Sequence, residues 1–369
     1  MDVSTPRQIG KSTMTVTPLG LGCGIMSRME VSNEQAMATI KAAWDSGVRF
    51  YDTSAWYGVG RSERRLGLAL LGAESPRTSP DRDTYRINTK VGRTLNPEPV
   101  HNKANDTFSP GGQIRNLRDS HSGFRVVFDY SYEQIMSQHW DSRQRLGHSR
   151  VDSLTIHDID YGYHHPDQVE EHMKQLSRTG GGGAKALEEL RKEGAISAIG
   201  CGCNLESRNA YSWEDSAHED LCMRIADTVD LDFFVIAGGY TLLETRALRR
   251  LLPLCEQRNI GIIIAAPYAS GWLVTPDESA PYMYDKPSDE IIRKSRGMKS
   301  ICDDVGVPLA AAAIQFPLAH HKVAAVIPGA KSPGEPKENY DYLNTEVPAE
   351  VWQRMKSERL LDENAPTPE

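Results

Sequence analysis

Short apolar and β-branched runs alternate with amphipathic helical stretches along almost the whole chain, and this alternation restricts the fold more than any other feature of the sequence. Repeated βα units of this kind build a parallel sheet. The predicted strands span residues 18–23, 48–54, 85–91, 151–157, 195–203, 231–237, 260–266 and 323–329. Eight strands close a (β/α)8 TIM barrel, so the sequence predicts one α/β barrel domain over residues 1–369. With 39% hydrophobic residues, the chain can bury one core of that size.

The helices between the strands are marked by capping residues at their starts and by glycines at their ends. Ser32 or Asn33 caps the first helix, and Gly47, Gly147 and Gly194 each follow a helix. The predicted helices end near residues 46, 72, 146, 192, 258, 305 and 318. The last two, over residues 288–305 and 310–318, come consecutively before the eighth strand, so we expect extra C-terminal helices. Residues 350–369 are predicted to add a short helix with a frayed tail.

Residues 94–127 interrupt this alternation of strands and helices. The segment is rich in Asn, Pro, Gly, Ser and His and shows no sustained period. It follows the third predicted strand and so leaves the face of a barrel where active sites form. We therefore predict a long loop inserted on the active-site face, as a lid or as a wall of the substrate pocket.

Composition excludes several classes of partner. The net charge is −8 and the basic residues are scattered, so no basic face for nucleic acid is expected. The N-terminus lacks a secretory signal and no apolar run is long enough to span a bilayer, which predicts a cytoplasmic protein without a membrane partner. The six cysteines are sparse and lie mostly in apolar segments, as expected of reduced, buried thiols. Cys201 and Cys203 alternate along one strand and should face the same layer.

Four chemically active side chains, Asp52, Tyr57, Lys90 and His157, lie near the ends of predicted strands. Parallel barrel strands bring their C-terminal ends to one face, so these groups can converge. An unperturbed phenol has a pKa of ~10, and Tyr57 therefore needs a nearby cation to act near neutral pH. Lys90 can supply that cation, and Asp52 can hold the ammonium in a buried pair. The arrangement predicts a Tyr57 pKa shifted toward the working pH, as general acid–base catalysis requires.

His157 is expected on the other side of the reacting oxygen. A neutral imidazole there can donate a hydrogen bond that orients a carbonyl or hydroxyl oxygen. Taken singly, His157 has a structural explanation as a strand-end histidine, and Asp52 and Lys90 have one as a salt bridge. Together they indicate proton and hydride transfer at a carbonyl, with no metal required.

The motifs around these residues resemble the signature of the aldo-keto reductases. They are GVRFYDTSAWYG at residues 47–58, RSERRLG at 61–67, TKVG around Lys90 and IHD around His157. The resemblance extends from about Arg7 to Leu343. It implies a (β/α)8 barrel, NADP or NAD as cofactor, and hydride transfer to or from a small sugar or aldehyde by a monomer or small homo-oligomer.

The same resemblance implies a set of cofactor contacts. Asn204 is similar to the residue that holds the nicotinamide carboxamide, and Ser270, Gly271 and Leu273 correspond to the pyrophosphate loop. The run IPGAKS at residues 327–332 is similar to the adenosine-phosphate clamp. In that clamp Lys331 and Ser332 can contact a 2′-phosphate or ribose, and Glu338 and Asn339 begin a helix close enough to hydrogen-bond the adenine. Glu335 stands where many relatives have a neutral glutamine, so a strict NADP preference is not expected.

Further motifs are similar to the aldose 1-dehydrogenase branch of that family, which includes D-threo-aldose, L-fucose, L-galactose and pyridoxal 4-dehydrogenases. They are GGYTLL at residues 238–243, AAPY at 265–268 and HDID at 157–160. Substrates of this branch can share a cyclic hemiacetal that is oxidised to a lactone. Trp56, Tyr130 and Trp272 are candidate pocket walls, because apolar rings pack on sugar or pyridine faces. Tyr240, Ala266 and Tyr268 are the three candidates for the residue that packs on the nicotinamide ring.

The sequence also allows other interpretations of its function. Within the same family, the chain could be a general carbonyl reductase that uses NADPH, or a non-catalytic barrel that binds nucleotide as a regulator. A metal-dependent barrel hydrolase would use the cluster His157, Asp158, Asp160, His164 and His165. A Rossmann dehydrogenase is suggested by GLGCG at residues 20–24, but the spacing is not G-x-G-x-x-G and no helix opens there.

Overall fold

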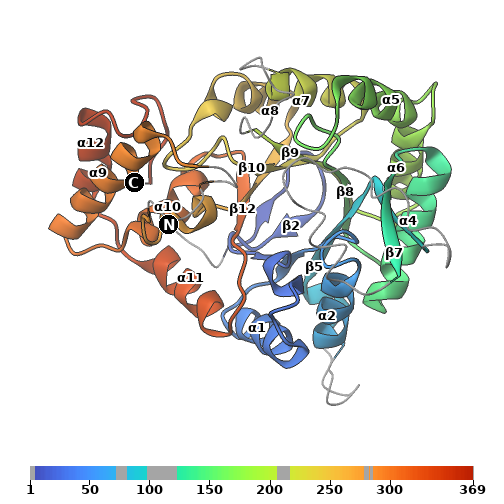
Figure 1. Ribbon diagram of the computed structural model, residues 1–369, viewed down its shortest axis with the longest axis horizontal. Coiled ribbons are helices and arrows are strands. Elements are labelled where there is room, and N and C mark those ends of the chain that lie inside the picture. The colour runs from blue at the N-terminus through green and yellow to red at the C-terminus, as the bar shows by residue number, and fades with distance from the viewer. Residues whose placement is uncertain are drawn as a thin grey trace.

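A computed structural model describes residues 5–71, 81–97, 123–205, 217–277, 282 and 286–368 of the chain. Eight parallel strands form one sheet in the order β12-β11-β10-β9-β8-β5-β4-β3. Parallel bridges from Leu19 to Val326 and from Gly22 to Gly329 join its two edges and close the barrel (Figure 1). The barrel strands are β3 (Leu21–Gly22), β4 (Phe50–Asp52), β5 (Arg86–Val91), β8 (Ser153–His157), β9 (Ala198–Asn204), β10 (Phe233–Ala237), β11 (Gly261–Ala265) and β12 (Val323–Ile327). The predicted (β/α)8 fold is confirmed.

Helices surround this ring of strands (Figure 1). Each predicted helix is present, and the α-helices are α1 (Asn33–Asp45), α2 (Arg61–Leu70), α4 (Tyr132–Leu146), α5 (Pro166–Leu176), α6 (Gly183–Lys192), α7 (Ala217–Thr228), α8 (Leu251–Arg258), α9 (Asp289–Asp304), α10 (Leu309–Gln315), α11 (Gly334–Asn344) and α12 (Ala349–Ser357). Short 3-10 turns are η1 (Ile25–Ser27), η3 (Arg82–Thr84), η4 (Arg246–Leu248), η5 (Ala269–Gly271) and η6 (Phe316–Ala319). Ser32 caps α1 by accepting the Gln35 N–H, as the sequence predicts.

Two helices, α5 and α7, are absent from the prediction, α11 begins four residues before the start expected at Glu338, and one predicted helix is shorter than expected. α5 has Pro166 at its first position and buries Val169, Met173 and Leu176, which lie on one helical face. The helix predicted over residues 243–258 begins only at Leu251. Pro253 explains this start, because proline lacks an N–H and is tolerated in the first turn of a helix but not in its interior.

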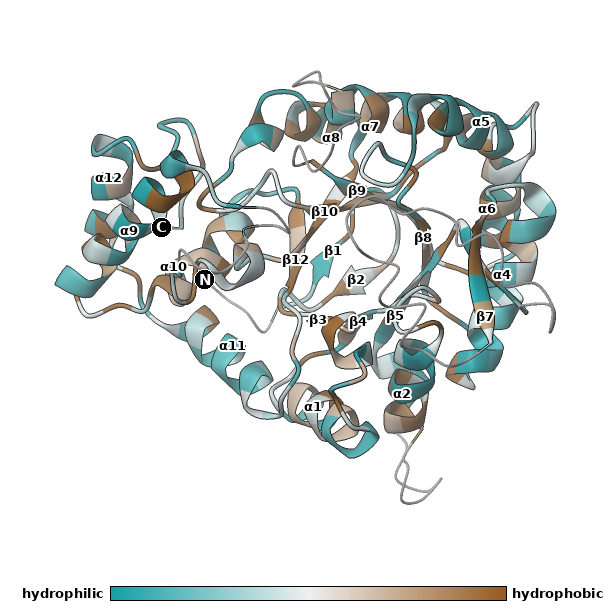
Figure 2. Cartoon of the chain, viewed as in Figure 1, coloured by the Kyte–Doolittle hydropathy of each residue, from teal (hydrophilic) through white to brown (hydrophobic). Residues whose placement is uncertain are grey.

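An N-terminal hairpin plugs the barrel from the end where the strands begin. β1 (Arg7–Gln8) pairs antiparallel with β2 (Thr15–Val16), and Figure 2 shows both strands inside the ring. The fully buried Ile9 and Met14 pack into one cluster with Phe50 and Phe233 of the barrel interior. The hairpin closes one end of the barrel, so the open end is the face where the strands terminate.

The segment predicted as a loop over residues 94–127 is ordered at both ends. β6 (Arg93–Pro97) pairs antiparallel with β7 (Phe124–Phe128), and Arg93 lies opposite Phe128. The expectation of an irregular loop is therefore wrong for these two ends, while residues 98–122 lie outside the described residues. Gly92 makes the turn from β5 into this ribbon with φ of +103°, and a Cβ there would lie 2.1 Å from the Tyr130 ring.

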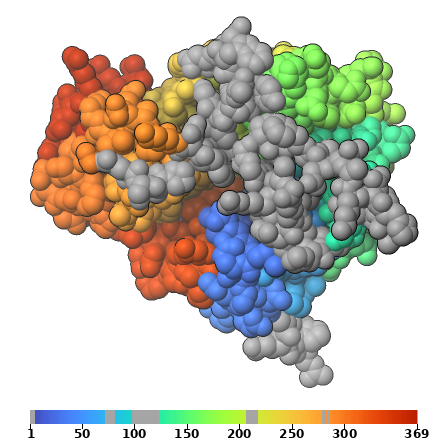
Figure 3. Space-filling model, viewed as in Figure 1, coloured from blue at the N-terminus to red at the C-terminus, as the bar shows by residue number. Residues whose placement is uncertain are grey.

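The C-terminal segment after α12 packs into the core beside α9 rather than fraying. Leu360 and Leu361 are 4% exposed and belong to the main core, so the expected frayed tail after α12 is wrong. Figure 3 shows the surface of the C-terminal segments, orange to red, along one side of the molecule. No single helix in the described ranges is long and apolar enough to cross a membrane; α9 and the α10–η6 run reach that length and apolarity only together, across a 109° bend.

All six cysteines are free and buried. Cys201 and Cys203 both point from β9 into the core outside the barrel, with their sulfur atoms 3.6 Å apart. The predicted shared layer is confirmed. Gly200 and Gly202 lie at the alternate, inward-facing positions, and the Phe233 ring fills the space that a Cβ on Gly200 would need.

Candidate active site

Asp52 and Lys90 form a buried ion pair at the open end of the barrel. They come from the neighbouring parallel strands β4 and β5. Lys90 Nζ lies 2.6 Å from Asp52 Oδ1, and the two side chains are 3% and 4% exposed. The ammonium also donates to the Thr53 carbonyl oxygen at 2.9 Å. Burial lowers the pKa of Lys90, but the Asp52 carboxylate and the Tyr57 phenol outweigh burial and raise it above its usual value, so Lys90 is a fixed cation.

A layer of polar side chains inside the barrel holds Asp52 from below. Asn88 donates from Nδ2 to Asp52 Oδ2 at 2.7 Å. The Asn88 amide oxygen accepts the hydroxyls of Ser153 at 2.8 Å and Thr155 at 2.9 Å. These residues lie two or four positions before Lys90 on β5 and His157 on β8, so they share the inward face. This layer was not predicted, although counting back in steps of two from Lys90 and His157 points to it.

Tyr57 lies in the turn after β4, half-buried above the ion pair. Lys90 Nζ is 4.6 Å from the centre of the Tyr57 ring. Burial raises the pKa of Tyr57 to about 12, and the Lys90 charge offsets only part of that rise. The prediction that Lys90 brings the pKa toward neutral is therefore wrong in net effect, because desolvation of the phenolate exceeds the attraction of one ammonium. Tyr57 is a protonated phenol at neutral pH.

His157 ends β8 and faces Tyr57 edge-on, with ring centres 5.8 Å apart and an interplanar angle of 87°. Its Nδ1 lies 3.2 Å from Ser54 Oγ. Burial, together with the charges of Arg93 and Lys90, holds the pKa of His157 well below its usual value, so the imidazole is neutral. Tyr130 donates from its hydroxyl to the His157 carbonyl oxygen at 2.7 Å and is fully buried. The structure thus places Tyr130 behind the His157 backbone, where it fixes the strand end instead of walling a pocket.

Asn204 ends β9 beside this centre. Its Nδ2 donates to Asp160 Oδ2 at 3.0 Å, and its backbone N–H donates to the same oxygen at 3.2 Å. The loop after β11 follows, where Ala269, Ser270 and Gly271 all have positive φ, from 47° to 97°. Such strained backbone is common where a loop clamps a ligand. This loop and Asn204 fit the nicotinamide and pyrophosphate portions of a dinucleotide.

The segment after β12 leads directly into α11. Lys331 is exposed, and Gly334 begins the helix three residues later. Glu335 accepts the Lys331 N–H at 3.1 Å and the Ser332 hydroxyl at 2.9 Å. Glu338 is exposed on the same helix. A helix N-terminus beside a lysine fits a phosphate, and a carboxylate fits ribose hydroxyls, so the segment suits the adenosine end of the cofactor.

The aromatic candidates separate in space. Tyr240 is fully buried, and its ring packs against Phe316 and His320. Tyr268 donates from its hydroxyl to Asn339 Oδ1 at 2.6 Å and so joins the β11 loop to α11. Ala266, at the end of β11, is half-buried with φ of 51°. The rings of Tyr240 and Tyr268 are thus both held by other contacts. Ala266, the third candidate, has no ring and lies at the end of a barrel strand.

The two tryptophans predicted as pocket walls occupy different places. Trp56, next to Tyr57, is 6% exposed and lies under the Arg93 guanidinium, 4.5 Å from its ring centre. Trp272 is 1% exposed, and its ring meets Tyr282 edge-on. It lines a separate hollow with residues of α9, and none of the four candidate catalytic residues lines that hollow.

The His and Asp cluster after β8 is held by hydrogen bonds. His164 Nε2 lies 2.9 Å from the Asp158 carbonyl oxygen, and Asp160 accepts the Gly162 N–H at 2.8 Å. Asp158 pairs with Arg93. Guanidinium and amide partners of this kind compete with a metal for the carboxylates, so the cluster does not favour the hydrolase interpretation.

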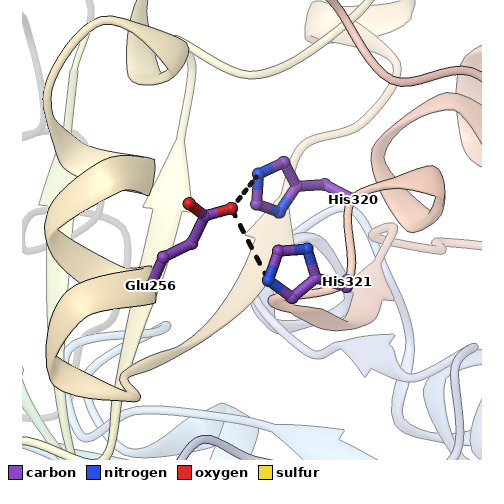
Figure 4. Close-up of side chains that lie close together, drawn as sticks. All are labelled: Glu256, His320 and His321. Atoms are coloured by element: carbon purple, nitrogen blue, oxygen red, sulfur yellow. Dashed lines mark ion pairs between the residues drawn. The ribbon is translucent and has the colours of Figure 1, made fainter.

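Among the described residues, Glu256, His320 and His321 form a group of metal-type ligands at the opposite end of the barrel (Figure 4). Both histidine Nε2 atoms lie 3.5 Å from Glu256 Oε1, and the two rings stack 4.9 Å apart. The Lys322 N–H donates to His320 Nδ1 at 3.2 Å, so neutral His320 carries its proton on Nε2. A metal would need the lone pair of that nitrogen. The geometry therefore favours a hydrogen-bonded surface cluster.

The Aldo/keto reductase family model matches residues 18–359, and the chain belongs to this family. It is 37% identical to pyridoxal 4-dehydrogenase of Microbacterium luteolum over 368 residues, 98% of this chain and 99% of that protein. It is 33% identical to D-threo-aldose 1-dehydrogenase of a Pseudomonas species over 371 residues, 99% of each chain. An aldo-keto reductase of Bacillus halodurans in its holo form shares the fold with a TM-score of 0.67 at 22% identity, over 99% of this chain and 98% of that one.

Family membership and the barrel together define an NAD(P)-dependent oxidoreductase. The predicted family and its aldose 1-dehydrogenase branch are confirmed. The Rossmann interpretation is wrong, because residues 20–24 contribute to a barrel strand and its turn.

Proposed function

We propose that this oxidoreductase acts on small cyclic hemiacetals, either aldoses or pyridoxal, and oxidises them to lactones. The observation that carries the proposal is the Tyr57 phenol above the buried Asp52–Lys90 pair, with neutral His157 facing it at the same barrel end. The two relatives at 33% identity or more are an aldose dehydrogenase and a pyridoxal dehydrogenase over nearly their whole lengths. Pyridoxal and aldoses share the ring hemiacetal, which supports it as the reacting group.

In the proposed reaction, the hemiacetal hydroxyl oxygen lies between Tyr57 and His157. The bound nicotinamide supplies a hydride acceptor. Tyr57 Oη takes the hydroxyl proton as the carbon-bound hydrogen leaves with its electron pair, and the carbon–oxygen bond becomes the lactone carbonyl. His157 orients the oxygen, while Lys90 stabilises the phenolate and Asp52 holds Lys90. In reduction the same groups act in reverse, with Tyr57 as acid.

The Tyr57 pKa predicts different pH dependences for the two directions. With a pKa of about 12, the phenol is protonated at neutral pH and the base form is scarce. Because oxidation needs the base form, we expect kcat/KM for oxidation to rise roughly tenfold per pH unit from neutral to alkaline pH. Reduction uses the protonated phenol and should stay flat over that range. Initial rates in both directions at constant ionic strength test this; an oxidation rate that is flat or falls with pH contradicts it.

We propose that NAD is the preferred cofactor. The carboxylate of Glu335 occupies the two donors, Lys331 N–H and Ser332 O–H, that a 2′-phosphate would otherwise use. A dianionic phosphate placed there meets a like charge, whereas the ribose hydroxyls of NAD can donate to a carboxylate. Glu335 therefore supports NAD over NADP.

Replacing Glu335 with glutamine should shift this preference. The variant keeps the side-chain length and loses the negative charge, so we expect kcat/KM with NADP to rise about tenfold, the size of one partly screened charge contact. The value with NAD should change little. Asp341→Asn is the matched control, because Asp341 pairs with Lys337 at 2.5 Å on the exposed surface of the same helix. Equal NADP gains in both variants, or none in Glu335→Gln, would contradict the assignment.

The substrate class is tested by nicotinamide absorbance with NAD or NADP and a panel of L-fucose, L-galactose, D-arabinose and pyridoxal. The controls are the methyl glycosides of the three sugars, which have no free hemiacetal hydroxyl. We expect cofactor reduction with a free hemiacetal and none with its glycoside. Silence across the panel, with reduction of simple aldehydes by NADPH, supports a general carbonyl reductase. Cofactor binding without any turnover supports a nucleotide-binding regulator.

We also propose that the protein works in the cytoplasm. The six free, buried cysteines suit a reducing compartment, because no pair is used as a structural disulfide.

A further inference from the structure

Arg93 is held in a cage of three aromatic rings beside the active site. It begins β6, directly after the Gly92 turn, and its side chain is 2% exposed. The guanidinium carbon lies 4.5 Å from the ring centre of Trp56, 4.8 Å from that of Phe128 and 4.4 Å from that of Tyr163. Planar guanidinium groups stack on aromatic faces, so the cage fixes both the position and the direction of this charge.

The caged guanidinium pairs with the carboxylate of Asp158, the residue that follows His157. Arg93 Nη2 contacts Asp158 Oδ2, and the same oxygen lies 3.1 Å from His157 Nε2. Asp158 has φ of 49°, a left-handed backbone that turns its side chain back toward the strand end. Asn204 Nδ2 lies 3.4 Å from the other oxygen, Oδ1. The Asp158 carboxylate thus contacts Arg93 of the β6–β7 ribbon, the His157 imidazole and Asn204 at the end of β9.

The hydrogen bonds on the two sides of His157 agree on one tautomer. Ser54 Oγ accepts the Trp56 N–H at 3.0 Å, so its own proton is free to donate to His157 Nδ1. An ionised Asp158 can only accept, which requires the proton on Nε2. The imidazole is therefore held neutral, with its N–H on the side of Asp158.

We propose that Arg93 and Asp158 are positioning residues for the reaction: Asp158 holds His157 in the Nε2–H tautomer, the one Nε2 proton is shared between Asp158 and the substrate oxygen, and the caged Arg93 holds Asp158. This inference rests on the proposed role of His157. It also makes the base of the β6–β7 ribbon part of the active site, because Arg93 and its cross-strand partner Phe128 belong to that base. Arg93 acts through Asp158 and touches no reacting atom.

A buried ion pair can also be only structural, so the variants must separate the two roles. Asp158→Gly removes the carboxylate and suits the left-handed backbone, Asp158→Asn keeps an oxygen acceptor, and Arg93→Met removes the charge. The matched control is Arg82→Met at the opposite end of the barrel. Arg82 also pairs with a buried aspartate, Asp152 at 2.6 Å, and also stacks on a ring, that of Tyr85 at 4.8 Å.

The kinetic experiment is a double-mutant cycle on kcat for the substrate that the panel identifies. We expect Asp158→Gly and Arg93→Met each to lower kcat about 10-fold to 100-fold, the cost of a misdirected catalytic group. Asp158→Asn should recover most of the loss, and the Arg93→Met/Asp158→Gly double variant should be no slower than the slower single variant. Arg82→Met should lower the melting temperature and leave kcat within about twofold. Single variants with unchanged kcat, losses that multiply in the double variant, or an equal loss in Arg82→Met would overturn the proposal.

A second readout does not depend on turnover. Nitrogen-15 NMR of histidine-labelled protein distinguishes the two neutral tautomers, and His157→Gln assigns the signal. We expect the Nε2–H form of His157 in the wild type and in Arg82→Met, and a mixture in Asp158→Gly and Arg93→Met. The same tautomer in all of these proteins would overturn the proposal. If the wild type oxidises nothing in the panel, the proposed function fails, while this measurement still decides the positioning role.

Discussion

Tyr57→Phe should abolish hydride transfer in both directions while cofactor binding is retained. The phenylalanine ring keeps the edge-on contact with His157 and the face toward Lys90, and it loses only the hydroxyl. We expect kcat to fall about 1,000-fold, within the range attributed to general acid–base catalysis. Stopped-flow or steady-state absorbance gives kcat, and quenching of tryptophan fluorescence gives the dissociation constant for NAD. A kcat within tenfold of the wild type would show that another group moves the proton.

Tyr51→Phe is the matched control for that variant. Tyr51 lies six residues earlier on β4, is fully buried, and donates from its hydroxyl to the Val48 carbonyl oxygen at 3.2 Å. Removing this hydroxyl deletes a buried hydrogen bond outside the site, so we expect a small loss of stability of about 1 kcal/mol and unchanged kcat.

Lys90→Met should have the second largest effect, on catalysis and stability together. The substitution removes the cation beside Tyr57 and leaves the Asp52 carboxylate buried without its ion partner. Breaking a buried pair in this way costs about 3 to 5 kcal/mol of folding free energy. We also expect kcat for oxidation to fall by about 100-fold or more, because the phenolate loses its stabilising charge. Thermal melting and steady-state kinetics on the same preparation give both values.

The Lys90→Met/Asp52→Asn double variant separates these two effects. Replacing the carboxylate by an amide removes the uncompensated charge, and the new amide oxygen can still accept the hydrogen bond that Asn88 donates to Asp52. Stability should therefore recover, whereas kcat should stay low. Recovery of kcat together with stability would mean that Lys90 has only a structural role.

The sequence predicted the barrel because strand period, helix caps and glycine stops all agreed with one topology. The same topology explains why Asp52, Lys90 and His157 could be brought together in advance, since each lies at the C-terminal end of a parallel strand. The N-terminal hairpin was missed, because its strands are two residues long and carry little pattern. The β6–β7 ribbon after β5 was missed for a related reason. In the described part of the chain it consists of two short strands at the two ends of the segment predicted as a loop.

Side-chain surroundings were harder to predict than backbone positions. Tyr130 and Trp272 are aromatic residues near barrel loops, yet both are fully buried, and Tyr130 supports the His157 backbone. Asn88 and Arg93 gave no separate signal, because a polar residue inside a strand acquires meaning only from its neighbours across the sheet. The sign of the Tyr57 pKa shift depended on burial, a three-dimensional quantity that the spacing of residues does not carry.

The most direct test of the central claim follows one hydrogen atom. A substrate from the panel is labelled with deuterium at its hemiacetal carbon and incubated with NAD and either wild-type protein or Tyr57→Phe. Mass spectrometry then measures the deuterium in the nicotinamide and the amount of lactone formed. We expect one deuterium transferred per lactone formed by the wild type, and almost none with Tyr57→Phe. Lactone formed without label in the nicotinamide, or equal transfer by both proteins, would contradict it.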